Sequence, residues 1–163
     1  MTESKSGFTL IILLSIVFAM IASILPLPFS VQAFRPNWLF LVLFFWLLIV
    51  PGSINIYWVC AIGLLSDLLL AEPLGLNAFC FICVAFLMSR IPIRMSTIPF
   101  WQQFILLLLL NFLYLSVKSA LLFFSGLPCL WWQNFIVVLL NCVVWPWVYS
   151  VLNSFWKKRT TVY

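Results

Sequence analysis

This chain has very little charge with which to face water. Its 163 residues include 8 Lys and Arg and 3 Asp and Glu, so that 7% are charged, while 66% are hydrophobic. An ordinary soluble domain is about 25% charged and about 45–50% apolar. So few charges cannot solvate a globule of this size, which excludes a water-soluble monomer, a disordered chain and a basic nucleic-acid binder. The composition predicts a polytopic membrane protein that is surrounded by the lipid bilayer and has no nucleic-acid partner.

Six apolar runs, separated by Pro, Gly and polar residues, are candidate membrane spans. They cover about residues 8–25, 37–50, 54–70, 74–91, 101–124 and 130–152 of a single integral membrane domain, 1–163. The second run is short for a hydrocarbon core of ~30 Å. We therefore expect it to be shielded by its neighbours, to thin the bilayer locally, or to include Pro36 and Asn37. The predicted fold is an all-α bundle of six transmembrane helices.

The positions of the cations predict the orientation of these spans. With six spans and a cytoplasmic N-terminus, the cytoplasmic segments hold Lys5, Arg90, Arg94, Lys157, Lys158 and Arg159. The outer segments then hold Arg35 alone, and Lys118 lies within a span. Cytoplasmic segments of membrane proteins carry an excess of Lys and Arg. The asymmetry predicts that both termini are cytoplasmic.

Four ionisable residues gather in the expected outer half of the bundle. Arg35 precedes the second span, Asp67 and Glu72 lie near the end of the third, and Lys118 lies within the fifth. We expect Asp67 to pair with Lys118 or Arg35, because an unpaired charge in a span costs about 2.5–3.5 kcal/mol. The alternative is that Lys118 reaches the interface alone and that Asp67 caps the end of a helix.

Two amides and two stripes of small residues are expected to hold helices together. Asn111 and Asn141 lie near the middle of successive antiparallel spans, which predicts an interhelical hydrogen bond, with contact to a substrate as the alternative. Small residues recur every four positions in two stripes, Ser15, Ala19 and Ser23, and Ser116 and Ala120. Such stripes allow close approach of helices. They are candidate surfaces for a partner helix, and chance in an apolar helix is the alternative.

The sequence offers little for catalysis or metal binding. It has no His, which is the commonest metal ligand and the usual general base at neutral pH. Cys80 and Cys83 form a CxxC, but no second pair accompanies them, so we expect both to pack as small hydrophobes. We therefore expect no catalytic, cofactor-binding or metal-binding residue, and no enzyme.

Two motifs, taken in order, resemble those of one family. The segment Phe34-Arg35-Pro36-Asn37-Trp38 resembles the Arg-Pro-Asp/Asn signature of the bacterial rod shape-determining membrane protein MreD. Gly63 and Asp67, followed by Glu72-Pro73-Leu74-Gly75, resemble a second hallmark of that family. Length, span order and the basic tail are similar over essentially the whole chain.

The resemblance implies a multi-pass protein of the bacterial cytoplasmic (inner) membrane. It would be a non-enzymatic scaffold of the cell-elongation (rod) complex, which inserts peptidoglycan along the side wall and so sets cell shape. The implied direct partner is the single-span protein MreC, with MreB, RodA and a class B transpeptidase in the same complex.

The resemblance also supplies an alternative function. The implied fold is a compact bundle similar to the substrate-binding subunits of energy-coupling-factor transporters, so the chain could instead be a solute-binding membrane subunit. A scaffold needs no ligand cavity, whereas a solute-binding subunit needs convergent polar groups at the outer side. The candidates for such a pocket are Arg35, Asn37, Asp67, Glu72, Asn77 and Lys118.

Overall fold

The structure is a computed structural model that describes residues 3–25, 35–49, 55–91, 99–126 and 131–160, with side chains placed for all of these except 3–8, 131–133 and 157–160. Six α-helices lie in this part of the chain: α1 (Glu3–Ile24), α2 (Trp38–Ile49), α3 (Ile56–Leu70), α4 (Leu76–Arg90), α5 (Phe100–Phe124) and α6 (Trp131–Thr160). The prediction of an all-α fold with six helices is therefore confirmed. The last helix continues beyond residue 152, where the apolar run was expected to end.

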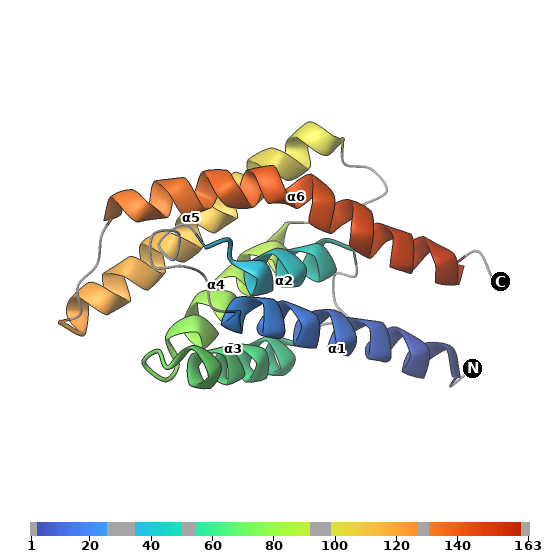
Figure 1. The fold of residues 1–163 in the computed structure, drawn as a ribbon, viewed down its shortest axis with the longest axis horizontal. Helices are drawn as coiled ribbons and strands as arrows, with labels where there is room; N and C mark the ends of the chain where they lie inside the picture. Colours follow the sequence, from blue (N-terminus) through green and yellow to red (C-terminus); the bar gives the residue numbers. More distant parts are fainter. Residues whose placement is uncertain (1–2, 26–34, 50–54, 92–98, 127–130, 161–163) are drawn as a thin grey trace.

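The helices alternate in direction (Figure 1). In that view α1, α3 and α5 run one way, and α2, α4 and α6 return, so the start of α1 and the end of α6 lie at the same end of the molecule. At the opposite end, α1, α3 and α5 finish and α2, α4 and α6 begin. We call it the cavity end, because a cavity described below lies there. Sequentially adjacent helices pack as antiparallel pairs, with α3 against α4, α1 against α2, and α5 against α6.

The short helix α2 forms the centre of the core. Its 12 residues extend about 18 Å at 1.5 Å per residue, and all of Leu39–Leu48 are buried. Helices α1, α4 and α6 contact it, and the ring of Phe44 meets that of Trp145 on α6 at 5.0 Å. Of the three expectations for this short run, shielding by neighbours is the one observed. Because α2 is enclosed by protein, it does not have to match the thickness of a bilayer.

The longest helices face outward. In α5 and in the segment Asn134–Trp156 of α6, an 18-residue window has a mean hydropathy of 2.1, and both helices are long and apolar enough to cross a membrane. Most of their residues are not buried in the bundle. A helix whose exposed surface is apolar is stable only where that surface meets lipid or another apolar helix.

The stripe on α1 packs inside the bundle. Ala19 is 2% exposed, and the Ser15 hydroxyl accepts a hydrogen bond of 2.8 Å from Nε1 of Trp46 on α2. Ser23 lies further along, at the cavity end. The expectation that this stripe is a surface for a partner helix is thus corrected at Ser15 and Ala19, because Ser15 bonds to α2 of the same chain and Ala19 is buried within it. Ser116 and Ala120 on α5 are half-buried and stay candidates for such a contact.

We expect Ala19→Leu to destabilise the protein itself. A larger side chain at this buried position, one turn after the Ser15 contact with α2, overpacks the inner face of α1 at a cost of about 1–3 kcal/mol. The midpoint of thermal unfolding in detergent should fall, whereas Val17→Leu, at a position that is 50% exposed, should leave it unchanged. An unchanged midpoint for Ala19→Leu would show that this face of α1 is not closely packed in the bundle.

Candidate functional site

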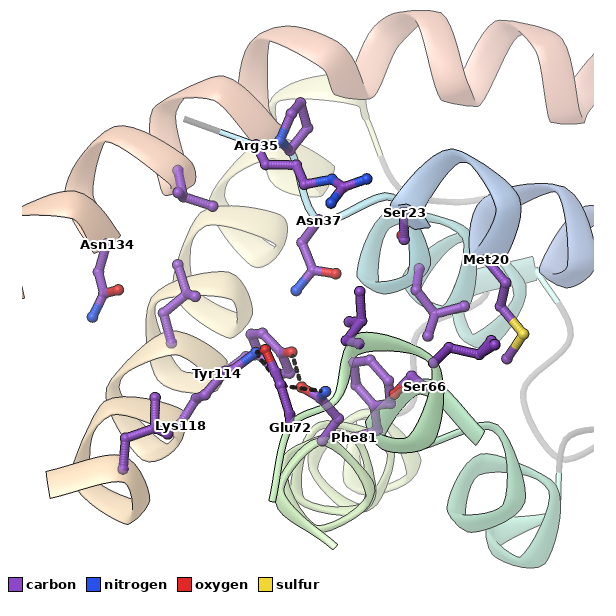
Figure 2. Close-up of a pocket in the computed structure, with 18 of the residues that line it drawn as sticks. Met20, Ser23, Arg35, Asn37, Ser66, Glu72, Phe81, Tyr114, Lys118 and Asn134 are labelled. Carbon is purple, nitrogen blue, oxygen red and sulfur yellow. Dashed lines mark hydrogen bonds and ion pairs between the residues drawn. The ribbon is translucent and has the colours of Figure 1, made fainter. Parts of the chain in front are cut away.

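A cavity of about 470 Å³ lies among the helix ends at the cavity end. It is the region drawn in Figure 2, where side chains from several helices point toward a common space. The polar side chains that line it are Ser23, Arg35, Asn37, Ser66, Glu72, Asn77, Tyr114, Lys118, Ser119 and Asn134. Five of the six residues expected to form an outer pocket are among them, and Asp67 is not. A scaffold does not require such a cavity, whereas a solute-binding subunit does.

An ion pair crosses one wall of the cavity. Nζ of Lys118 on α5 lies 2.8 Å from Oε2 of Glu72, which follows α3. The side chains are 17% and 27% exposed, so both charges are largely withdrawn from solvent. The expected pairing of Asp67 with Lys118 is therefore wrong, because Glu72 takes that place. The pair ties α5 to the connection between α3 and α4.

Asp67 instead binds the start of α4. Its carboxylate is fully buried and accepts two backbone hydrogen bonds, from Gly75 N at 2.8 Å and from Asn77 N at 2.9 Å. The first N–H groups of a helix lack partners within the helix, and the helix dipole favours negative charge there. The alternative expectation, that Asp67 caps a helix end, describes what is observed.

A hydrogen-bonded chain continues from the ion pair into the core. Asn77 Nδ2 donates to Glu72 Oε2 at 2.7 Å, and the Tyr114 hydroxyl donates to Asn77 Oδ1 at 2.6 Å. The chain Lys118–Glu72–Asn77–Tyr114 thus joins α4 and α5 through the turn after α3. Tyr114 was missed as a site residue, although it lies four positions before Lys118 and hence on the same helix face.

Ser119 and Asn134 were also missed by sequence reasoning. The Asn134 side-chain amide donates a hydrogen bond to the Ser119 hydroxyl, which joins α5 to α6 beside the cavity. Their position near the ends of two antiparallel helices is the only feature of the sequence that could have pointed to them.

Arg35 closes the end of α1. Its Nη2 donates to the carbonyls of Ala22 at 3.2 Å and Leu25 at 2.8 Å. These carbonyls lie at the C-terminal end of a helix, where carbonyl groups lack partners within the helix and a cation is favourable. Within the described residues Arg35 has no carboxylate partner and its buried Nε has no hydrogen-bond partner, so the alternative pairing with Asp67 is also wrong.

Pro36 and Asn37 precede α2 and accept hydrogen bonds from the N–H groups of its first turn. The backbone N–H of Trp38 donates to the Pro36 carbonyl at 3.0 Å, and that of Phe40 donates to Asn37 Oδ1 at 3.3 Å. Asn37 N donates in turn to Asn141 Oδ1 on α6 at 2.9 Å. The Arg35-Pro36-Asn37 motif therefore connects the end of α1, the start of α2 and the middle of α6.

The expected hydrogen bond between Asn111 and Asn141 is not formed. Both are fully buried, but Asn141 accepts from Asn37 N instead. The nitrogen and oxygen of the Asn111 amide have no hydrogen-bond partner in the described part of the chain. A buried amide without partners costs about 1–3 kcal/mol, so Asn111 does not stabilise the bundle through a side-chain hydrogen bond.

The two amides should respond differently to replacement by Leu. We expect Asn111→Leu to keep or raise the midpoint of thermal unfolding, because it removes a buried amide without partners. Asn141→Leu should lower the free energy of unfolding by about 1–2 kcal/mol, because it leaves Asn37 N without an acceptor. Equal destabilisation by the two substitutions would contradict this difference in hydrogen bonding.

Gly63 and Gly75 shape the pair of helices that carries this network. A Cβ at Gly63 on α3 would lie 2.3 Å from Cα of Ala78 on α4, so only Gly allows the two backbones to approach this closely. Gly75 precedes α4 and has φ of 93°, which L side chains rarely adopt. The second sequence motif therefore builds the packing of α3 on α4.

Metal-binding groups do not come together in the part of the chain that the structure describes. No group of three or more His, Cys, Asp or Glu side chains is placed there to hold an ion. Cys60, Cys80, Cys83 and Cys142 are free, and Cys80 is fully buried.

Comparisons with known proteins identify the family. Residues 4–155 match the family model described as rod shape-determining protein MreD. The rod shape-determining protein MreD of Haemophilus influenzae is 26% identical over 142 residues, which cover 87% of this chain and 88% of that protein. No solved structure matches the chain. The family model covers nearly the whole sequence, and the chain therefore belongs to the MreD family of rod shape-determining membrane proteins.

Proposed function

We propose that this protein is a non-enzymatic scaffold of the bacterial cell-elongation complex. In this proposal it spans the cytoplasmic membrane six times with both termini in the cytoplasm, so that the cavity end lies on the outer, non-cytoplasmic side of the membrane. Membership of the MreD family supports a role in rod shape. The alternating helix directions are consistent with an even number of crossings (Figure 1).

The observation that carries the scaffold proposal is the apolar outward surface of α5 and α6. Phe112 on α5 and Phe135 on α6 are 47% and 59% exposed, and their rings meet at 5.8 Å. Leu139 and Val143 continue this surface along α6 at four-residue intervals and are 62% and 69% exposed. Transmembrane helices associate through close packing of such surfaces. We propose that the single membrane span of MreC packs here, alongside lipid.

Affinity purification tests the scaffold proposal. The tagged protein is solubilised gently from its native membranes, and the proteins that remain bound are identified by mass spectrometry. We expect MreC, with MreB, RodA and a class B transpeptidase in smaller amounts. Recovery of an ATPase pair with a coupling membrane subunit, without MreC, would contradict the proposal.

Tryptophan substitutions test the proposed surface. Leu139→Trp and Val143→Trp place a bulky ring where a partner helix would pack, so the recovery of MreC should fall while the protein level stays normal. Leu14→Trp on α1, at a position that is 60% exposed, is the matched control and should not change recovery. Unchanged recovery for both α6 variants would exclude this surface as the binding site for MreC.

The cavity favours a second candidate function. A solute-binding subunit of an energy-coupling-factor transporter needs an enclosed site with a few polar groups, and the cavity of about 470 Å³ lies within the usual range of ligand pockets, about 300–1,000 Å³. Co-purification separates the two functions, because a transporter subunit would bring its ATPases with it.

A further inference from the structure

The cavity carries one positive charge that its own carboxylates do not compensate. Lys118 and Glu72 neutralise each other across 2.8 Å. Arg35 also lines the cavity, and in the described part of the chain it has no carboxylate partner. Asp67 does not line the cavity, and its two oxygens are engaged by the N–H groups at the start of α4. The described lining therefore has a net charge of +1.

Several hydrogen-bond donors in this lining can make further hydrogen bonds. The buried Nε of Arg35 has no partner in the described residues, and Nζ of Lys118 has three hydrogens to share between Glu72 and a further acceptor. The Ser119 hydroxyl accepts from Asn134, which leaves its own hydrogen free to donate. Figure 2 shows the amide of Asn37 near the middle of the same space. A ligand with several acceptor oxygens would satisfy these donors.

The remaining walls are apolar. Met20, Leu39, Phe81 and Leu115 line the cavity together with the polar groups. A volume of about 470 Å³ holds a compact charged group and a short apolar portion, but not a whole phospholipid. Such a mixed lining suits an anion that is attached to an apolar body, because the charge meets the cations and the body meets the apolar wall.

We infer that the cavity at the ends of α1, α3 and α5 binds a phosphate-type anion, either the headgroup of an anionic lipid or a free phosphate ester. Phosphate offers several acceptor oxygens and a negative charge, and Arg and Lys are its usual partners. This inference does not depend on the scaffold proposal, because it concerns a site inside the chain and not its outward surface.

Opposite charge changes at the ion pair give the sharpest test. Binding is measured on purified protein in neutral detergent, as the concentration of phosphatidylglycerol or glycerol 3-phosphate needed to raise the midpoint of thermal unfolding. Lys118→Gln lowers the charge of the lining by one and should weaken binding about tenfold, whereas Glu72→Gln raises it by one and should strengthen binding about tenfold. Both substitutions disturb the same ion pair, so a purely structural effect would weaken binding in both.

Two further variants control for global charge and for folding. Arg90→Gln on α4 removes one cation near the opposite end of the bundle and should leave binding unchanged. If it weakens binding as much as Lys118→Gln does, attraction to the whole surface explains the effect and the inference is wrong. Should Lys118→Gln fail to fold, the double variant Lys118→Gln/Glu72→Gln removes both charges and should bind nearly as well as the unaltered protein. Loss of binding in a folded double variant would also overturn the inference.

The probes distinguish the two sources of the anion. The opposite response of the two variants with phosphatidylglycerol alone supports a lipid headgroup, and the same response with glycerol 3-phosphate alone supports a free phosphate ester. Equal stabilisation by zwitterionic phosphatidylcholine would show that the cavity does not select for negative charge, and this would overturn the inference. No stabilisation by any of the three probes would overturn it as well.

Discussion

Replacing Gly63 by Ala is expected to lower the free energy of unfolding by about 3 kcal/mol, because the added methyl group forces α3 and α4 apart. The new Cβ would lie 2.3 Å from Cα and 2.7 Å from N of Ala78. These are backbone atoms of a helix, which cannot move aside as the end of a flexible side chain can. The displacement would also separate Asp67 on α3 from the N–H groups that it binds at the start of α4.

Two measurements show whether close backbone contact between α3 and α4 causes the loss of stability expected for Gly63→Ala. The first is the fraction of folded protein that survives heating in detergent, and the second is the restoration of rod shape in cells that lack their own copy. Gly75→Ala is the matched control: its Cβ would meet nothing within 4 Å, so only the strain of φ 93° remains, about 1–2 kcal/mol. Because the Cβ that Gly63→Ala adds would clash with backbone atoms of Ala78, Ala78→Gly should not rescue Gly63→Ala. Rescue would show that the methyl groups alone collide.

The sequence was sufficient to predict the helical class, because long apolar runs interrupted by Pro and Gly have few other solutions in a membrane. The sequence also limited the short second run to a few possible arrangements. A helix of 12 residues that cannot cross a bilayer by itself must either be enclosed or distort its surroundings, and α2 is enclosed. Which helices enclose it depends on packing between distant segments, which the apolar pattern does not encode.

Partner choice among the charged residues could not be predicted. Four charges at similar depth allow several pairings, and the backbone between Asp67 and Glu72 decides among them. Ala71 adopts a left-handed conformation with φ of 52° that ends α3, and Glu72 N then donates to the Asp67 carbonyl at 3.0 Å. This turn separates the directions of the two carboxylates, so that Glu72 meets Lys118 while Asp67 meets α4. A left-handed Ala is uncommon, and composition alone does not indicate it.

The stripe on α1 illustrates a second limit of sequence reasoning. Spacing of small residues predicts that another helix approaches closely, and Ala19 does lie at such a contact. The same spacing does not say whether that helix belongs to the chain or to a partner.

The cavity differs from the stripe, because the sequence did predict that its charged residues lie together. Their similar expected depth in the membrane predicted all three charged residues of the described lining, but Tyr114 was overlooked within an apolar run, where an aromatic residue suggests core packing.

Asp67→Asn is the second substitution with a large expected effect. The amide keeps the shape of the side chain but replaces one acceptor oxygen with an N–H₂ group, which would face the backbone N–H of Gly75 or of Asn77. One buried donor then has no acceptor, and the other loses a charged partner, so the free energy of unfolding should fall by about 3 kcal/mol. Glu72→Gln is the matched control, since Glu72 is partly exposed and its amide oxygen still accepts from Asn77.

Charge exchange separates helix capping by Asp67 from ion pairing. If Asp67 acts by binding the start of α4, Asp67→Lys/Lys118→Asp should be as unstable as Asp67→Lys alone, because no Lys side chain can accept from Gly75 N and Asn77 N. Glu72→Lys/Lys118→Glu should recover much of the stability that either single reversal loses, because their ion pair can form in the reverse sense. Thermal unfolding of the purified variants measures both. Rescue of the Asp67 exchange, with none of the Glu72 exchange, would mean that Lys118 pairs with Asp67 and that the buried carboxylate is not a helix cap.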